Sequence, residues 1–437
     1  MQVAIDKLSD VLRNSPHFDL LFNLCTAKDA CLVGGAIRDA LIGRQITDLD
    51  LIFPDDPTAL AKAFARQIGG HWFWLDKPRL QSRVVVKHDS DCLHYDFALF
   101  RAPDLERDLL DRDFTLNALA LPLTGALSVA SLVDPCQGLN DLQRGSLRMV
   151  GNDAFANDPL RVVKGIRHAT VLGLAVEPAT LRSMHDEAAK LKRVAPERIR
   201  QEIWKILADG QAARGLQLLH ESGAGEQLFG EGFAGCLQEL AGRLEVCRNA
   251  WRQLAGGNPV VSDWLAHEVE QGLSNEILLV WTFLLMSIEQ KLPVVLAGEW
   301  LLSRKAITYI AGIVALDKRV MNEFAAIARN ERAYAWWAAR CHIDPKLLLL
   351  ALAALDGTVT GPVAEQIQAL LPVAARLTDL RPNDLIDGHW MRNELRFKDG
   401  PEMSKAMELL RNAEITGQVN STEGARQFLL RHYQNRD

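Results

Sequence analysis

Two aspartates, Asp48 and Asp50, alternate with apolar residues at the start of the run Asp-Leu-Asp-Leu-Ile-Phe. Such a run predicts a β-strand, and residues two apart on a strand point to the same face. Two carboxylates on one face suit a hard cation such as Mg²⁺, which prefers oxygen ligands and usually keeps substrate phosphates in its coordination shell. The spacing therefore predicts a metal site for a phosphorylated substrate.

A pair of glycines, Gly34 and Gly35, must be positioned near these aspartates. They follow a short apolar run, residues 31–33, that predicts a strand, and they precede a predicted helix over residues 36–41. Glycines let backbone amides approach a phosphate closely, and a helix N-terminus adds its positive end. The glycine turn and the aspartate strand together predict a site for a metal–triphosphate complex.

Other common nucleotide motifs do not explain this site. No Gly-x-x-x-x-Gly-Lys-Ser/Thr occurs, which argues against a P-loop kinase or ATPase. One Gly-x-Gly-x-x-Gly, at Gly230, Gly232 and Gly235, follows a predicted helix rather than a strand, so we do not expect a dinucleotide site there.

Two further polar groups follow along the chain. In the first, Arg112 and Asp113 precede Asn117, and Asp113 could also simply cap a helix by bonding backbone amides. In the second, Asp158 and Arg161 are three apart; on a helix they would share a face and could form a surface ion pair of little energetic weight.

The length and charge of the chain set broad limits. With 437 residues it is too long for one ordinary core, and its net charge of −6 does not indicate a general nucleic-acid binder, although a local basic face can bind RNA. Its seven cysteines contain no CxxC, which fits a reducing compartment. The run 277–288 is too short to span a bilayer, so we expect a cytoplasmic protein without a membrane segment.

The hydrophobic pattern changes near residue 155. Before it, strand candidates alternate with helices; after it, we expect helices and no further strands. Residues 222–235 are glycine-rich and predict a linker, and residues 377–387 predict another boundary. The strand candidates are residues 31–33, 49–53, 71–75, 83–87 and 94–100.

Taken in order, these segments resemble the class II tRNA nucleotidyltransferase and bacterial poly(A) polymerase family. Five blocks carry the resemblance: Gly34-Gly35 with Asp48 and Asp50; Arg112-Asp113; Asp134-Pro135 with Gly138 and Asp141; the run Asn157 to Arg161; and Pro196 to Ile199 with Glu202. The clear resemblance covers residues 23–220, and a weaker one runs from Asp384-Leu385-Ile386 to Glu423-Gly424-Ala425.

The resemblance implies an α+β fold, in which a polymerase-β-like nucleotidyltransferase head with a small mixed sheet is followed by an all-helical neck, body and tail. The expected boundaries are 1–125 for the catalytic head, 126–225 for the nucleotide-selecting neck, 226–380 for the body and 381–437 for a tRNA-binding tail. The implied activity is template-independent addition of C, A or both to the tRNA 3′ end from CTP or ATP, with Mg²⁺ as cofactor. Oligomeric state is not indicated.

The resemblance also assigns roles to residues. Asp48 and Asp50 would hold two Mg²⁺ ions, and Asp96 is either a third catalytic carboxylate or a structural acid on the strand 94–100. Arg112 and Asp113 would bind the ribose hydroxyls. The full set expected to bind the nucleotide is Gly34, Gly35, Arg38, Arg112, Asp113, Asn117, Asp158, Arg161, Lys164 and Arg167.

Base choice has a chemical explanation at Asp158 and Arg161. A carboxylate accepts from the exocyclic amine of cytosine or adenine, and a guanidinium donates to the ring acceptor beside that amine. Uracil and guanine present a carbonyl instead, which the carboxylate repels. Contacts to RNA phosphates are expected from Lys190, Lys192, Arg193, Arg198 and Arg200, unless these only form a solvated helix face.

Three positions depart from the family pattern. Asp111 and Lys164 stand where arginines are common, and Asn157 stands where glutamate is common. The product is therefore open between CCA, CC, a single A and a poly(A) tail; a compact segment between Asp50 and His94 favours CC addition. A poly(A) polymerase and an RNA-binding scaffold with a degenerate site are the alternatives.

Overall fold

The computed structural model describes residues 8–88, 91–256, 258–288, 293–316, 324, 334, 344–356, 362–379, 386, 388–397, 400–415, 418–419 and 421–433. The chain forms two units, Met1–Glu231 and Gly232–Asp437. The first unit contains all of the individual residues for which the sequence predicts a catalytic, nucleotide-binding or RNA-binding role, whereas the predicted tRNA-binding tail belongs to the second unit.

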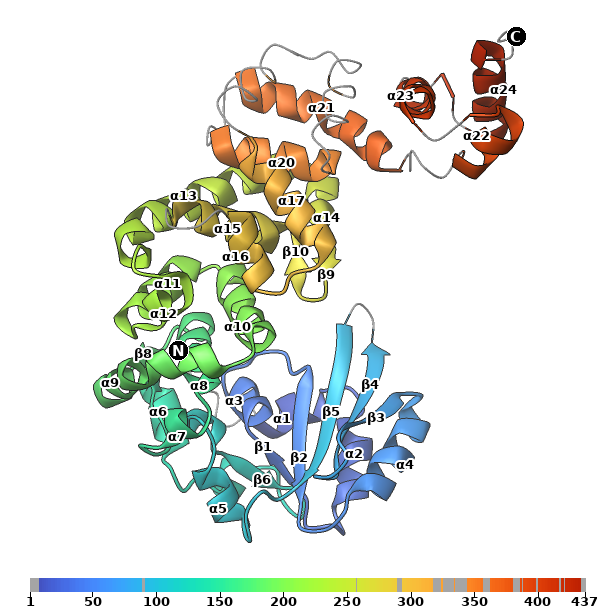
Figure 1. Ribbon diagram of the computed structural model, residues 1–437. Coiled ribbons are helices and arrows are strands. Elements are labelled where there is room, and N and C mark those ends of the chain that lie inside the picture. Colours follow the sequence, from blue (N-terminus) through green and yellow to red (C-terminus); the bar gives the residue numbers. More distant parts are fainter. Residues whose placement is uncertain are drawn as a thin grey trace. The chain divides into compact units, whose positions relative to one another are not determined.

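A six-stranded mixed sheet organises the first unit (Figure 1). Its order is β3-β4-β5-β2-β1-β6, in which β2 and β5 are parallel and the other neighbouring pairs are antiparallel. The strands are β1 (Cys31–Val33), β2 (Asp48–Phe53), β3 (His71–Asp76), β4 (Gln81–His88), β5 (Asp91–Leu99) and β6 (Ala120–Pro122).

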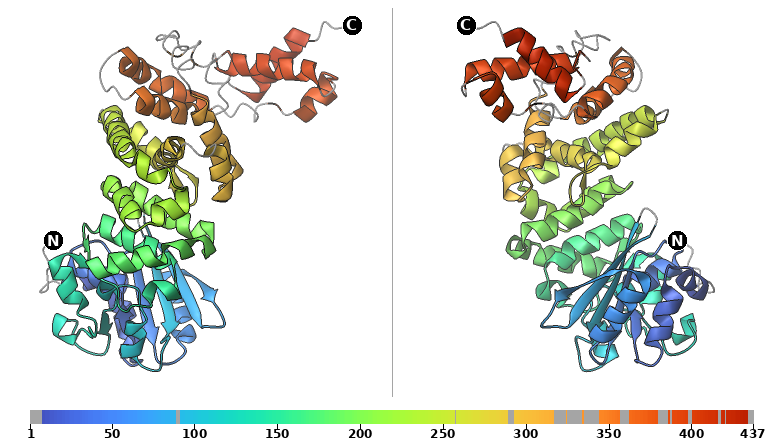
Figure 2. Two further views of the ribbon diagram at one scale, coloured as in Figure 1. Left: turned by 60° about the vertical axis from the view of Figure 1, so that its left-hand side comes forward. Right: turned by 90° about the vertical axis from the view of Figure 1, so that its right-hand side faces the viewer.

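The two faces of this sheet have different surroundings. One face packs on four helices, which lie along it in the right-hand view of Figure 2 and share a core with Leu32, Leu49 and Tyr95. The opposite face is covered by a smaller apolar cluster only near β1, where Val33 and Leu109 are buried. The four helices are α1 (Leu8–Arg13), α2 (Phe18–Cys25), α3 (Gly35–Leu41) and α4 (Thr58–Ile68), and α5 (Leu105–Leu110) belongs to the smaller cluster.

Helices complete the first unit. Here α8 packs against α10 and α11, and its buried residues Val163 and Ile166 alternate with polar ones at helical spacing. The two-residue strands β7 (Ser146–Leu147) and β8 (Ala175–Val176) pair in parallel. The helices are α6 (Gly138–Arg144), α7 (Ala154–Asn157), α8 (Leu160–Val171), α9 (Pro178–Glu187), α10 (Pro196–Ala208), α11 (Ala212–Glu221) and α12 (Ala224–Phe229), with 3₁₀ turns η2 (Thr115–Asn117), η3 (Val129–Ser131) and η4 (Ala188–Arg193).

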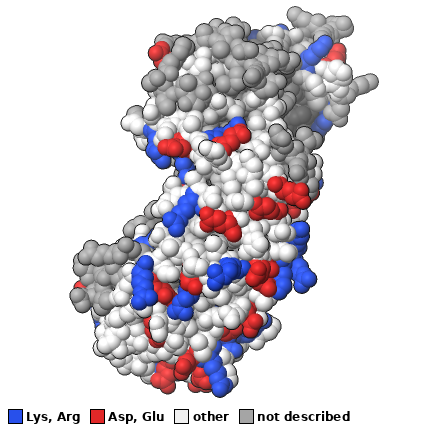
Figure 3. All heavy atoms as spheres, turned by 90° about the vertical axis from the view of Figure 1, so that its left-hand side faces the viewer, with Lys and Arg blue, Asp and Glu red and all other residues white. Residues whose placement is uncertain are grey.

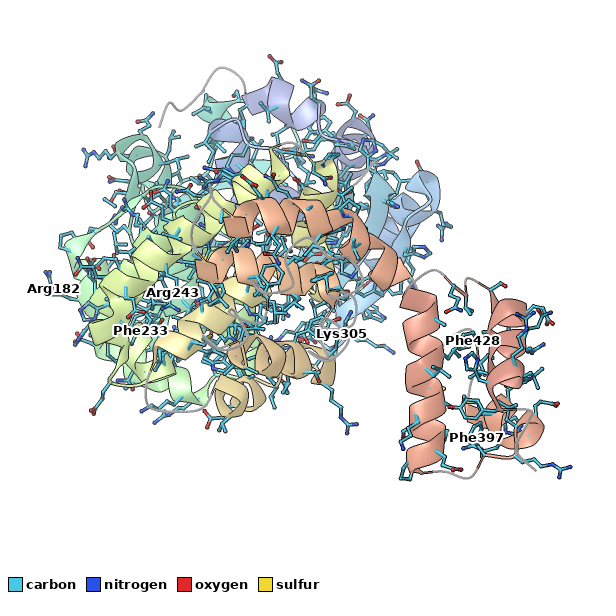
Figure 4. All side chains as sticks on the ribbon, turned by 90° about the horizontal axis from the view of Figure 1, so that it is seen from above. Arg182, Phe233, Arg243, Lys305, Phe397 and Phe428 are labelled. Carbon is cyan, nitrogen blue, oxygen red and sulfur yellow. The ribbon has the colours of Figure 1, made fainter. Side chains whose placement is uncertain are left out.

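The second unit is mainly helical in its described part. Trp251 and Trp281 are buried in it, and a separate small core near the end of the chain contains Phe397 with Phe428 packed against it (Figure 4). Its elements are α13 (Phe233–Ala255), α14 (Pro259–Ala266), β9 (Glu268–Glu270), β10 (Leu273–Ser274), α15 (Asn275–Ser287), α16 (Pro293–Glu299), α17 (Arg304–Val314), α20 (Pro345–Asp356), α21 (Pro362–Asp379), α22 (Gly388–Glu394), α23 (Pro401–Ile415) and α24 (Thr422–Tyr433).

The fold confirms most of the sequence predictions. All five strand candidates are strands, and residues 277–288 lie in the buried helix α15; none of the described helices has the length and apolar character needed to cross a membrane. Two predictions were wrong. Short strands β8, β9 and β10 do follow residue 155, and most of the predicted linker 222–235 is helix, because α12 and the start of α13 occupy it. Asp384 and Leu385 lie outside the described residues.

A glycine-to-alanine change tests how closely helix α6 packs against the 3₁₀ turn η2. A Cβ on Gly138, the first residue of α6, would clash with the carbonyl group of Thr115 in η2. We expect Gly138→Ala to destabilise the protein by about 1–3 kcal/mol or more, as overpacking does. Gly125→Ala, where a Cβ meets open space, is the matched control. Thermal unfolding of the three proteins checks this, and equal midpoints for both variants would contradict the packing.

Candidate active site

The β2 strand presents Asp48 and Asp50 on the sparsely covered face of the sheet. Both side chains are exposed, whereas Leu49 between them is buried in the main core. The register aligns Asp50 with Val33 of β1 on one side and with Asp96 of β5 on the other. The shared face predicted from the spacing of the two aspartates is thus present.

Asp96 lies beside Asp50 but is already bonded. Its two oxygens accept from Arg83 Nε at 2.6 Å and Arg83 Nη2 at 2.8 Å, and Arg83 is the partner of Asp96 in the β4–β5 register. Such a bidentate pair holds the carboxylate in one orientation. In this arrangement Asp96 has the contacts of the structural acid; a catalytic role for it stays a prediction.

The environment of Asp50 shifts its protonation. Its pKa rises to about 6, first because surrounding protein displaces water from the carboxylate and second because the negative charge of Asp96 lies nearby. Arg112 and Arg83 act in the opposite direction, and Asp48 adds a smaller increase. Although it is crowded in this way, Asp50 keeps exposed surface, so a ligand can reach it.

Asp48 has neighbours of a different kind. His94 Nδ1 lies 2.8 Å from Asp48 Oδ1, and the Thr47 hydroxyl donates to Asp48 Oδ2 at 3.0 Å. His94 is two residues before Asp96 on β5 and is aligned with Asp48 in the parallel register. Sequence reasoning missed His94, although the two-residue spacing from Asp96 was a signal for a shared face.

The donor set at β2 fits a hard divalent cation. Two exposed carboxylates stand on one face, and Mg²⁺ is commonly held by one or two carboxylates together with substrate phosphates. Within the described residues, no group of three or more His, Cys, Asp or Glu side chains is arranged as a metal site by itself. Water molecules, or oxygens of a bound triphosphate, would therefore complete the coordination.

The glycine turn lies next to Asp50. Gly34 has φ 74° and ψ −131°, a conformation that strongly favours glycine, and its N–H donates to the Leu119 carbonyl at 3.1 Å. A Cβ placed on Gly34 would lie 3.2 Å from Arg112 Nη1 and 3.9 Å from Asp50 Oδ2. Gly35 begins α3, whose N-terminus has no side-chain cap. The glycine turn thus lies close to both Asp50 and Arg112.

A buried hydrogen-bond network supports this turn from behind. Arg38, only 8% exposed, donates from Nε and Nη2 to Asp39 and from Nη1 to Asn117 Oδ1 at 2.7 Å. Asn117 Nδ2 in turn donates to Asp113 Oδ1 at 3.0 Å. All three guanidinium nitrogens of Arg38 therefore donate to acceptors within the protein. These contacts favour a supporting role, and direct binding of the nucleotide by Arg38 stays a prediction.

Arg112 and Asp113 are held by neighbouring backbone and side chains. Arg112 Nη2 lies 3.2 Å from Asp108 Oδ1, and Asp108 is fully buried. Asp113 Oδ1 accepts from the Phe114 amide at 2.8 Å, which is the amide-capping role considered as the alternative to ribose binding. Both residues remain partly exposed, so capping and ligand binding are compatible here.

The Asp158 and Arg161 pair is arranged differently from the expected helix face. Asp158 has extended backbone and precedes α8, so an ion pair along one helix does not form; Asp158 Oδ2 instead lies 3.4 Å from Arg198 Nη2. Arg161 donates from Nη2 to the Asp111 carbonyl at 2.8 Å and from Nη1 to the Arg112 carbonyl at 3.4 Å. The structure therefore connects Arg161 to the Arg112 segment.

The rest of α8 carries two more predicted residues and one that was missed. Arg167 Nε lies 2.6 Å from Glu202 Oε2, so α10 supports α8 at this point. Lys164 is partly exposed. His168 is buried, and Nη2 of Arg167 lies 3.2 Å from its Nε2. Burial, and next the positive charge of Arg167, hold the pKa of His168 well below its usual range. Its position on α8 one turn after Lys164 was the available signal.

The predicted RNA contacts are placed on η4 and α10. Lys192 and Arg193 are exposed, Lys190 pairs with Glu187, and Arg200 lies over the ring of Trp204 at 5.0 Å. On the face drawn in Figure 3, basic and acidic residues are interspersed rather than gathered into one basic patch. Phosphate contact by these residues stays a prediction.

The mixed sheet with its carboxylates beside a glycine turn, followed by helices, defines a polymerase-β-like nucleotidyltransferase. The family model described as the poly A polymerase head domain matches residues 30–148, and that described as the probable RNA and SrmB-binding site of polymerase A matches residues 173–235. A CC-adding tRNA nucleotidyltransferase of Geobacter sulfurreducens is 30% identical over 417 residues, 92% of this chain and 91% of the relative. The chain therefore belongs to the class II tRNA nucleotidyltransferase and poly(A) polymerase family.

Other relatives differ in the product that their names state. An A-adding tRNA nucleotidyltransferase of Deinococcus radiodurans is 41% identical over 44% of this chain and 43% of the relative. A CCA-adding enzyme of Geobacillus stearothermophilus is 28% identical over 94% of both. The fold is similar to that of a Thermotoga maritima CCA-adding enzyme solved in complex with tRNA, with TM-score 0.59, 19% identity and coverage of 99% of this chain and 100% of that one. Enzymes of this fold family typically use a divalent metal ion.

The raised pKa of Asp50 predicts a pH dependence for cation binding. A carboxylate must be ionised to bind a metal, so below about pH 6 the protonated form of Asp50 competes with the cation. We expect the affinity of the free enzyme for Mn²⁺ to fall by about tenfold per pH unit below that midpoint and to level off above it. Calorimetric titration between pH 5 and 8 measures this; Asp50→Asn should remove the midpoint, and the same profile in that variant would contradict the assignment.

Proposed function

We propose that this protein adds C, A or both to the 3′ end of tRNA, using CTP or ATP, Mg²⁺ and the face of β2 as its catalytic surface. The observation that carries this proposal is the register of Asp48 and Asp50 with the glycine turn: Gly34, Asp50 and Arg112 converge within one small region. The relatives named as CC-, A- and CCA-adding enzymes support the substrate. A tRNA substrate also agrees with the predicted cytoplasmic location.

The reaction is an in-line displacement on the nucleotide. The 3′-hydroxyl of the RNA attacks the α-phosphate, the bond from that phosphate to the β-phosphate oxygen breaks, and pyrophosphate leaves. Asp48 and Asp50 would hold Mg²⁺, which when bound would neutralise charge on the triphosphate and lower the pKa of the attacking hydroxyl. Arg83 neutralises Asp96, so the additional negative charge beside Asp50 stays balanced when the anionic substrate arrives.

The Arg112 segment orients the nucleotide. Arg112 lies against the glycine turn and Asp113 keeps one oxygen outside the bonds described above, which suits contact with ribose hydroxyls. A site built to bond a hydroxyl rejects the analogue that lacks it, so ribonucleotides are favoured over deoxynucleotides. We assign Arg38 to the support of Asn117 and of this segment rather than to the nucleotide itself.

Base choice is assigned to Asp158 and Arg161. For both to face a base, Asp158 has to leave Arg198, and Arg161 has to exchange the Asp111 carbonyl for the ring acceptor of the base. Asp158 Oδ1 also accepts from the Leu160 amide at 3.2 Å and Arg161 Nη1 also donates to the Ala154 carbonyl at 3.2 Å, so these two bonds have to be exchanged as well. Asn157 stands where the family commonly has glutamate, and it is exposed in this structure. The order of C and A addition has to be measured.

A tRNA assay tests the proposed function directly. We expect incorporation of labelled CTP or ATP into at least one of three tRNAs that end before, within or after CC, and a loss of roughly 10²–10⁴-fold in Asp50→Asn, because removal of a metal ligand costs several kcal/mol of transition-state stabilisation. Long A tails on unstructured RNA would indicate the poly(A) polymerase alternative. No incorporation by the wild-type protein would leave the scaffold alternative.

A change of base specificity tests the assignment of Asp158. We expect Asp158→Ala to reduce the preference for CTP over UTP by roughly 10–100-fold in kcat/KM, because the carboxylate no longer repels the uracil carbonyl. Asp153→Ala, an exposed carboxylate shortly before α7, is the control and should keep the wild-type preference. Unchanged discrimination in Asp158→Ala would show that another group selects the base.

A further inference from the structure

The edge strand β3 exposes apolar side chains on the face of the sheet that carries the catalytic residues. Phe73 is 44% exposed and Leu75 is 42% exposed. Among the phenylalanines that the structure describes, Phe73 is the only one classed as exposed. An exposed aromatic side chain on an ordered strand offers a flat apolar surface on which a ligand can pack.

The register places Phe73 in one row with the catalytic carboxylate. Phe73 is aligned with Arg83, Arg83 with Asp96, and Asp96 with Asp50. Aligned residues on neighbouring strands project to the same face, and strands are about 4.8 Å apart, so Phe73 stands roughly 14 Å from Asp50 along this row. Between them the Arg83–Asp96 pair balances its own charge.

The alternation along β3 shows that Phe73 is not a displaced core residue. Trp72 packs against the main core, and Lys62 of α4 lies 4.4 Å from the centroid of its ring. Trp72 is aligned with the buried residue Val84 of β4. The helix-covered face of β3 is thus filled by tryptophan, and Phe73 belongs to the opposite, catalytic face.

The row is closed at its other end. Beyond Asp50 it continues to Val33, which is buried in the cluster that contains Leu109 and Ala118. Along this row, the face of the sheet is therefore accessible toward β4 and β3 and not toward β1. A polymer whose 3′-hydroxyl reaches Asp50 has an open path along the row toward Phe73.

We propose that Phe73, with Leu75 beside it, is a stacking platform for an unpaired base of the RNA 3′ end. In a tRNA that ends in CC, the unpaired base before the two cytidines lies two nucleotides upstream of the reacting hydroxyl, and an extended rather than stacked strand carries it across the roughly 14 Å from Asp50 to Phe73. Stacking on an aromatic ring tolerates every base, which suits an RNA end that changes as nucleotides are added. The proposal rests on the function proposed above and specifies where the RNA end is held.

Binding and kinetics with separate substrates test the platform. We expect Phe73→Ala to raise the Kd for a tRNA that ends in CC by roughly 5- to 100-fold, as loss of one base–aromatic stack does, with KM for CTP within twofold of wild type. Phe73→Tyr should restore the wild-type Kd, whereas Phe73→Leu should behave like Phe73→Ala. Val246→Ala, an equally exposed apolar side chain on α13, is the control that should change neither constant.

A spectroscopic readout and the oligomeric state separate the possible outcomes. A 2-aminopurine placed in the unpaired 3′ end should be quenched on binding to wild type and to Phe73→Tyr, and less quenched on binding to Phe73→Ala. An unchanged Kd for the CC-ending tRNA in Phe73→Ala, an effect confined to the KM for CTP, or a dimer that this variant alone dissociates would each overturn the platform. Absence of any incorporation by wild type would instead refute the proposed function.

Discussion

The parallel pairing of β2 with β5 is the constraint on which the site depends. It sets Asp50 beside Asp96, two like charges in register, and the pKa of Asp50 rises to about 6, first through loss of water around its carboxylate and second through the charge of Asp96. Such a pair is tolerated because Arg83, in register on β4, binds both oxygens of Asp96. The antiparallel pairing of β1 then brings the glycine turn to the same place, so four neighbouring strands are needed to arrange the two carboxylates proposed to be catalytic.

A second level of support links the sheet to the helices behind it. Arg38 of α3 binds Asn117, and Asn117 binds Asp113, the residue proposed to contact the ribose. His168 of α8 lies at the limit of hydrogen-bond distance from Asn117, and Arg167 beside it pairs with Glu202 of α10. The segment proposed to bind the nucleotide is therefore held by a chain of polar contacts that extends through three helices, which restricts its movement without occupying its exposed edge.

The sequence predicted the parts of this arrangement that depend on local patterns. The alternation around Asp48 and Asp50 and the break at Gly34 and Gly35 are local, and they were sufficient for the strand, the shared face and the turn. The resemblance supplied the order of the blocks and the helical remainder. The two-residue strands, such as β8, escaped prediction because they carry too few residues to show a period.

Contacts between distant segments could not be predicted in this way. That Arg38 is buried against Asn117, that Arg161 binds backbone carbonyls of the Arg112 segment, and that Asp96 is taken up by Arg83 all depend on register and packing. Residue types and spacing indicate which chemistry a side chain can perform, whereas its partners follow from the fold. The same holds for Phe73, because its alignment with Asp50 through β4 and β5 follows from the strand register.

The central claim is that one cation-binding face joins the carboxylates of β2 to the glycine turn. Hydroxyl-radical cleavage by Fe²⁺ bound in place of Mg²⁺, in the presence of CTP, measures this most directly. The account predicts backbone cuts near Gly34, at Asp48 to Asp50 and near Asp96, suppressed by excess Mg²⁺ and absent in Asp50→Asn. Cuts confined to other segments, or cuts that persist in that variant, would contradict it.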